Sequence, residues 1–187
     1  MPLTKIKSLG ITDGTIALAD LSTTGTPSSA TFLRGDNSWA AALSAGQVIQ
    51  VVTATDSTVR STTSTSFVTG SNTLSASITP SSTSNKIFII VNTAGRQNTD
   101  GRYAIYTVYR GATNLGTSDG LLWLVPSGNR SCSVAMSYLD NPNSTSSLTY
   151  QVYFKTNVSD STVYLQDIAS LSGTGNLGSI TLLEIKG

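Results

Sequence analysis

The sequence contains no histidine and a single cysteine, Cys132. Without histidine, the chain lacks the usual general base at neutral pH and the commonest zinc ligand. A lone cysteine cannot form an internal disulfide, so the fold cannot depend on the crosslinks of small secreted domains. We therefore expect a protein that is not an enzyme and that binds no metal and no cofactor.

Charge is also scarce, since only 11% of residues are charged and the formal net charge is +1. Such a chain has no electrostatic field with which to gather phosphates, so we expect no nucleic-acid partner. The longest apolar runs, at 86–91 and 121–125, are far shorter than the roughly 20 residues that cross a bilayer. The first residues, 1–5, begin no signal peptide. We expect no membrane insertion and no export by the general secretory route.

Apolar residues nevertheless make up 39% of the 187 residues, and nearly a third of the chain is Ser or Thr. Short runs of β-branched and aromatic residues recur between Gly, Asn, Asp, Pro and Ser, and no segment has a sustained helical period. This pattern predicts ten strands, at 48–55, 66–70, 74–78, 86–93, 102–110, 121–125, 130–138, 147–157, 161–168 and 179–186. Ten short strands without helices favour an all-β fold, an antiparallel β-sandwich of the jelly-roll type.

The chain changes character near 40–45. Before that point, two short apolar runs are interrupted by polar Gly- and Pro-containing segments, and so few large apolar side chains cannot bury a core alone. We expect residues 1–45 to form an N-terminal attachment or stalk segment that packs on a partner. Residues 46–187 are expected to form the β-sandwich head.

Several predicted strands are apolar on both faces. In the last strand, Ile180 and Leu182 share one face while Leu183 and Ile185 share the other. A sheet with one face in water should alternate between apolar and polar residues. We therefore expect a homo-oligomer in which another subunit covers the second face. The alternative is a pair of fully internal strands in a monomer.

The segment FLRGDNSW, residues 32–39, contains the tripeptide that integrin-binding proteins display. The longer stretch 25–39, GTPSSATFLRGDNSW, resembles a segment that recurs in bacteriophage tail-fibre and other fibrous virion proteins. Residues 46–52, 64–67, 77–86 and 178–185 are similar to the two ends of a β domain commonly found after that segment. The middle, 92–173, matches no known pattern. We do not expect integrin recognition.

The resemblance implies a homotrimeric virion appendage, with an N-terminal stalk and a head similar to the tumour-necrosis-factor-like jelly rolls. Phe32, Leu33 and Trp39 would anchor the stalk around a threefold axis or against the head. Gly35 would supply a turn conformation that other residues resist. Arg34 and Asp36 would form local hydrogen bonds or an ion pair between subunits. The expected location is the virion, assembled in the cytoplasm of a bacterial host, with tail, neck or capsid proteins as partners.

Polar and aromatic residues near predicted loop ends are candidates for binding a host surface glycan or protein. They are Arg96, Asn98, Asp100, Arg102, Trp123, Asn129 and Asn141. Apolar neighbours on both sides of Trp123 favour a core or trimer-interface position over a sugar-stacking surface.

Under this resemblance, three functions are open. The first is a trimeric tail fibre or spike whose head contributes to host-surface adhesion. The second is a capsid decoration, neck or collar fibre protein without a receptor, since long fibres usually carry more repeats than the one seen here. The third is a depolymerase, because glycoside hydrolysis needs only two carboxylates. Most aspartates fall in predicted turns, however, and the only glutamate, Glu184, is expected to make a structural hydrogen bond.

Overall fold

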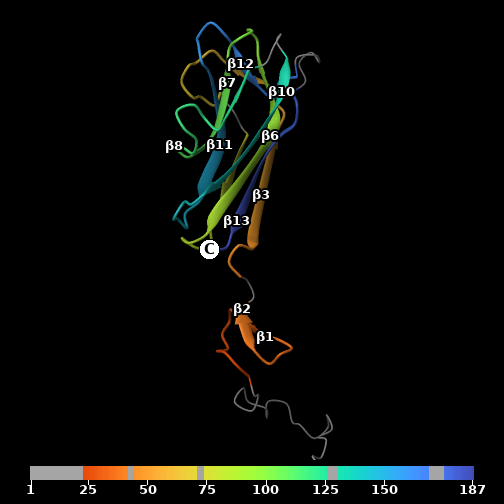
Figure 1. Cartoon of the computed structure of the whole chain (residues 1–187), viewed down its shortest axis with the longest axis vertical. Helices are drawn as coiled ribbons and strands as arrows, with labels where there is room; N and C mark the ends of the chain where they lie inside the picture. The colour runs from red at the N-terminus through yellow and green to blue at the C-terminus, as the bar shows by residue number, and fades with distance from the viewer. Residues whose placement is uncertain (1–22, 42–43, 71–73, 126–129, 169–174) are drawn as a thin grey trace, which may run out of the picture. The chain divides into compact units, whose positions relative to one another are not determined.

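The computed structural model describes residues 23–41, 44–70, 74–125, 130–168 and 175–187. The chain divides into two compact units, with the boundary between Ser44 and Ala45. The regular elements are β-strands (Figure 1), and no helix in the described ranges is long and apolar enough to cross a membrane. The strands are β1 Thr31–Leu33, β2 Trp39–Ala41, β3 Val48–Asp56, β4 Arg60–Thr62, β5 Ser75–Ile78, β6 Lys86–Gln97, β7 Ala104–Arg110, β8 Thr113–Asn114, β9 Leu122–Leu124, β10 Ser131–Asp140, β11 Leu148–Thr156, β12 Val163–Leu165 and β13 Gly178–Ile185.

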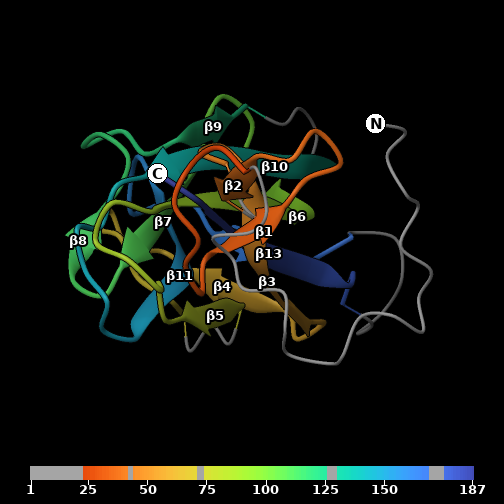
Figure 2. The same ribbon diagram turned by 90° about the horizontal axis from the view of Figure 1, so that it is seen from below.

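The head is a sandwich of two antiparallel sheets, seen end-on in Figure 2. In the first sheet, β3 pairs with β13, β13 with β6, and β6 with β10. In the second sheet, β5 pairs with β11, β11 with β7, and β7 with β9. The chain crosses between the sheets repeatedly: β3, β4, β6, β10, β12 and β13 lie in the first sheet, and β5, β7, β8, β9 and β11 lie in the second. Neighbouring strands of each sheet therefore come from distant parts of the sequence, as in a jelly roll. The prediction of an all-β jelly-roll sandwich is confirmed.

The core lies between the two sheets and is built from the alternate residues that face inward. The first sheet contributes Ile87, Ile89 and Val91 from β6, with Ile180 and Leu182 from β13. The second contributes Tyr106, Val108, Tyr150, Val152 and Phe154 from β7 and β11. Full burial of side chains of this size stabilises a fold by about 1.5–3 kcal/mol each. One continuous core therefore holds the head together.

Most predicted strands are present, with ends displaced by a few residues. The exception is 66–70, which is not a strand: Val68 forms only an isolated bridge with Phe154. The pattern also missed β4 and β8, which are too short to show a periodicity. Strand β6 continues to Gln97, beyond the predicted end at residue 93, because β12 pairs with its last three residues. The ends of these strands therefore depend on pairing with strands distant in the sequence, which the local pattern does not show.

Candidate functional site

The stalk motif folds into a small hairpin, in which β1 and β2 pair Leu33 with Trp39. Trp39 is further fixed because its amide donates to the carbonyl of Thr24 and its indole Nε1 donates to the hydroxyl of Thr23 over 3.2 Å. Phe32 and Leu33 remain 49% and 38% exposed. The hairpin therefore holds its aromatic anchor in place while leaving two large apolar side chains in solvent.

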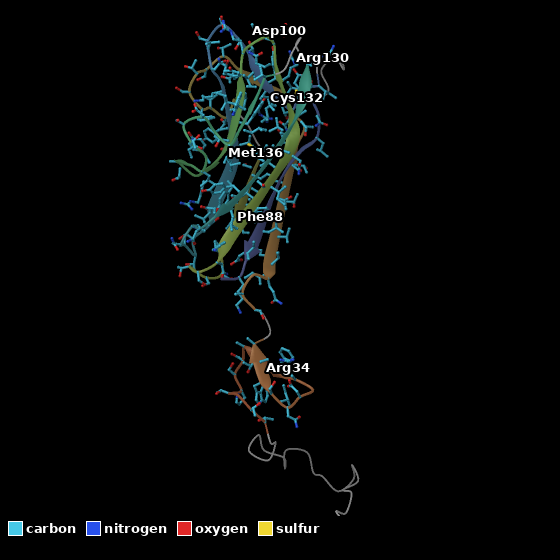
Figure 3. The ribbon with its side chains drawn as sticks, in the orientation of Figure 1. Arg34, Phe88, Asp100, Arg130, Cys132 and Met136 are labelled. Carbon is cyan, nitrogen blue, oxygen red and sulfur yellow. The ribbon has the colours of Figure 1, made fainter. Side chains whose placement is uncertain are left out.

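The Arg-Gly-Asp tripeptide forms the turn of this hairpin (Arg34 is labelled in Figure 3). The Asp36 carboxylate accepts hydrogen bonds from the amide and the hydroxyl of Ser38, and these bonds lower the pKa of Asp36. Arg34 and Asp36 also form an exposed ion pair at 3.7 Å. The local contacts expected for these two residues are therefore present.

The expectation for Gly35 is wrong. Its φ is not in the left-handed region, and a Cβ there would meet nothing within 4 Å. The left-handed position of the turn is instead Asn37, with φ of 62°. Asparagine tolerates this conformation because its short polar side chain can bond locally.

The outer face of the first sheet carries a row of large apolar residues. Backbone register places Val51 beside Leu183, Leu183 beside Phe88, and Phe88 beside Leu139, across β3, β13, β6 and β10. Ile90 follows Phe88 on the same face of β6. Val51 and Leu139 are 58% and 48% exposed, and the other three are half-buried. We call these five residues the outer apolar patch; Phe88 is labelled in Figure 3.

The patch ends after one further row. In the row of Ile90, the neighbouring strands present Thr53, Thr181 and Ser137, and in the next row the same face of β6 presents Asn92. The two-sided character expected of the terminal strands is therefore confined to one end of the sheet. Single exposed apolar residues are common, but a contiguous patch across four strands is typical of an interaction surface.

Three of the candidate binding residues are held by partners within the head. Arg96 forms an ion pair with Asp167, its Nε donating over 2.9 Å, and lies 3.7 Å above the ring of Tyr164. Arg102 pairs with Asp160 at 2.8 Å. These contacts give Arg96 and Arg102 a structural role at the end of β6 and in the following loop. The third is Asn98, whose Oδ1 accepts from the amide of Thr162 over 2.7 Å.

The remaining candidates do not converge on one site. Asp100 follows the end of β6 and is exposed (Figure 3), whereas Asn141 follows β10, whose last residue pairs with Ile87 at the start of β6. At about 3.3 Å per residue, the strand separates these two loops by about 30 Å. Asn129 lies outside the described residues. Trp123 is 60% exposed on β9, so the expected core position is wrong, whereas the trimer-interface position stays a prediction.

Several carboxylates are buried or form ion pairs with arginine side chains. Asp56, Asp140, Asp160 and Asp167 pair with arginines. Glu184 is 1% exposed, and its carboxylate accepts from the amide and hydroxyl of Ser81 and from Asn85 Nδ2 at 2.6, 2.8 and 2.6 Å. The structural hydrogen bonding expected of Glu184 is therefore present. Within the described ranges, no group of three or more acidic or cysteine residues could hold a metal ion.

Glu184 should make the head sensitive to acid. Burial alone raises the pKa of Glu184, but hydrogen bonds from Asn85 and Ser81 outweigh burial, so the folded pKa lies below the ordinary 4.5. A lowered folded pKa gives stability that is present above pH 4.5 and is lost as the pH falls through the folded pKa. We expect Glu184→Gln to lower the free energy of unfolding at pH 7 by about 1–3 kcal/mol and to weaken its decline in acid. Urea unfolding between pH 3 and 7 measures the free energy of unfolding and its decline in acid. The control is Asp160→Asn, which changes an exposed carboxylate. If Glu184→Gln loses stability in acid as steeply as the wild type does, the role of Glu184 in acid sensitivity is contradicted.

Sequence reasoning missed Phe88, Ile90 and Leu139 as members of a common surface, because only the sheet register brings them beside Val51 and Leu183. It also missed Tyr103 and Asp119, which lie with Trp123 around a surface pocket. In the sequence, Tyr103 lies within the predicted strand 102–110, and Asp119 lies between two predicted strands. Tyr106 faces the core while Tyr103 and Tyr109 face outward, so the three tyrosines are divided between the two faces of the sheet.

The fold and surfaces define the class of this protein as a jelly-roll head preceded by a separate small hairpin. No protein-family model matches the sequence, and no curated protein matches it. Among solved structures, the VP2 subviral particle of infectious bursal disease virus is similar, with a TM-score of 0.40 and 12% identity over 80% of this chain and 40% of that chain. T=1 particles derived from the same virus give 0.38 and 13% over 80% and 38%. The Gx strain structure gives 0.37 and 13% over 80% and 39%.

This chain therefore spans about two fifths of the length of the viral chains it resembles. At these identities and TM-scores, the similarity transfers neither a function nor a partner. The jelly-roll assignment depends on the strand pairing of this chain itself.

Proposed function

We propose that the protein is a structural component of a bacteriophage virion, a homotrimeric fibre or spike whose head contributes to host-surface adhesion. The observation that carries the proposal is the outer apolar patch, with Val51 and Leu139 about half exposed in a single chain. Another copy of the head that covers this face would remove the patch from water. The stalk motif at 25–39 supplies the link to phage fibres.

The hairpin supports the same proposal. Phe32 and Leu33 are exposed on a unit whose described residues form two short strands. An isolated two-stranded hairpin is at best marginally stable in water. Packing of three hairpins together, or of the hairpin on a virion protein, would bury these side chains. Residues 1–45 are accordingly assigned to attachment and the head to the exposed end of the appendage.

The second candidate is a decoration, neck or collar fibre protein that binds no receptor. It is favoured by the single copy of the stalk motif in this sequence, since long fibres usually carry more repeats. Both candidates are non-enzymatic, and both place the protein in the virion. They differ in whether the isolated head binds host cells.

Light scattering of the purified full chain tests the assembly, and we expect three times the mass of one chain. Immunogold labelling of intact virions with antibody to the head tests the location. Saturable binding of the labelled protein to host cells separates adhesion from decoration. A monomeric mass at micromolar concentration, or virions that no antibody labels, would contradict the proposal.

A further inference from the structure

The outer face of the second sheet carries a pocket of about 310 Å³, lined by Tyr103, Ile105, Asp119 and Trp123. Its floor is Ile105 of β7, which stands beside Trp123 of β9 in the sheet register. The rings of Tyr103 and Trp123 meet edge to face, with centroids 5.3 Å apart and an interplanar angle of 79°. The pocket therefore has two aromatic walls set nearly at right angles.

Both rings are open to solvent, with Tyr103 39% and Trp123 60% exposed. Leaving an indole in water forfeits the largest apolar burial that any side chain offers. These rings cannot be buried in the core of the head, because Ile105 and Trp123 lie on the opposite face of the sheet from the core residues Tyr106 and Val108. Ligand pockets usually have volumes of about 300–1,000 Å³, so this one is small. Its two exposed aromatic rings suit a ligand with a flat apolar face.

The polar wall is Asp119, which lies in the turn between β8 and β9. This turn is held in place because the amide of Asp119 donates to Thr117 Oγ1 over 3.1 Å, and Lys155 Nζ donates to the carbonyl of Ser118 over 2.7 Å. Gly120 follows with φ of 76°, and a Cβ there would lie 2.6 Å from the carbonyl oxygen of Tyr106. Only glycine lets the turn approach β7 this closely. Within the described ranges, no group donates a hydrogen bond to the Asp119 carboxylate.

The backbone at Tyr103 is also held in place. The amide of Tyr103 donates to Asn157 Oδ1 over 2.8 Å, and the amide of Asn157 donates to the carbonyl of Tyr103 over 3.3 Å. Sheet pairing between Ile105 and Trp123, together with these hydrogen bonds near Tyr103 and Asp119, gives a site that needs little ordering when a ligand enters.

The charges around the pocket select the ligand class. The described residues that line it carry one negative charge and no positive charge. Two cations of adjoining segments have partners of their own: Lys155 binds the Ser118 carbonyl and lies 4.6 Å from the centre of the Phe67 ring, and Arg102 pairs with Asp160. An acidic ligand would therefore meet the like charge of Asp119 in the lining of the pocket.

We propose that this pocket binds a pyranose unit of an uncharged glycan, which deepens the proposed adhesion function and rests on it for the source of the glycan. The C–H face of the sugar ring stacks on Trp123, with Tyr103 against its edge. Ring hydroxyls donate to the Asp119 carboxylate, which orients the sugar. An uncharged polysaccharide on the host surface supplies such a unit.

The test measures binding of the full chain to an array of neutral and sialylated oligosaccharides and to the purified surface polysaccharide of the host. We expect saturable binding of neutral glycans, reduced at least tenfold in Trp123→Ala and in Asp119→Asn. Leu177→Ala, which removes an equally exposed apolar side chain elsewhere, should bind as the wild type does. Thermal unfolding confirms that each variant is folded, and Trp123→Phe should restore part of the lost affinity.

Three results would overturn the inference. They are a preference for acidic glycans, wild-type affinity in the Trp123→Ala and Asp119→Asn variants, and no binding to any neutral glycan. Failure of this inference and failure of the proposed function give different results. A trimer found in virions that binds no glycan leaves the fibre assignment standing without this site. A monomer that binds neutral glycans through Trp123 contradicts the fibre and keeps the site.

Discussion

The double variant Val51→Lys/Leu139→Lys is expected to be a folded monomer, whereas the wild-type chain is expected to be a trimer. The two residues lie on β3 and β10, at opposite ends of the row that crosses the outer apolar patch. They are 58% and 48% exposed in one chain, so a lysine at either position can keep its ammonium in water when the head is alone. In a trimer that covers the patch, each lysine charge would be desolvated, at several kcal/mol per ion.

Light scattering measures this effect as a threefold fall in mass, and circular dichroism verifies that the sandwich remains folded. The matched control is Thr55→Lys/Ser133→Lys, which adds the same charges to the same strands and face but outside the patch. The control should remain trimeric. A double variant that keeps its trimer mass would show that this face is not the interface.

Asp140→Ala is expected to lower the free energy of unfolding by about 3–5 kcal/mol, the usual cost of removing one partner of a buried ion pair. Both Asp140 carboxylate oxygens accept from Arg110 Nη1, over 2.8 and 2.7 Å, and Oδ2 also accepts from the Tyr150 hydroxyl over 2.6 Å. Burial and this hydrogen bond raise the pKa of Tyr150 above its ordinary value of 10.0. Without Asp140, the Arg110 charge and the Tyr150 hydroxyl lose their partner between β7, β10 and β11.

Calorimetry should show this loss as a fall in Tm of roughly 10 °C for a chain of this size. Asp160→Ala is the control, since the Arg102–Asp160 pair is exposed to 37% and 61% and should contribute less than about 1 kcal/mol. Equal losses in the two variants would mean that burial of the Asp140 cluster adds nothing to stability.

The strands of the core were predictable because their signal is local. The segment 86–91 and the tyrosine-containing segment 102–110 are rich in β-branched and aromatic residues, and alternation assigned Tyr106 to one face and Tyr103 to the other. The hairpin was not predicted as two strands. Its three-residue strands are too short to show alternation, and the choice of Asn37 over Gly35 for the left-handed position depends on how the turn closes on Ser38.

The surfaces were less predictable, because they combine residues distant in sequence. Trp123 has apolar neighbours on both sides and matches a core residue by local pattern. It is exposed because β9 pairs with β7 in a register that places Trp123 beside Ile105, on the side away from the core. Asp140 matches a turn residue, yet its partner Arg110 lies 30 positions away.

The sequence by itself determined an all-β head without a disulfide, and the inner face of most of its strands, because β-propensity and period-two alternation act between near neighbours. Only the tertiary structure decided the register that aligns Val51, Leu183, Phe88 and Leu139 in one row and gathers Tyr103, Asp119 and Trp123 around one pocket. Register depends on cross-strand contacts between segments far apart in the chain, and a shift of one residue would exchange the inner and outer faces of a strand.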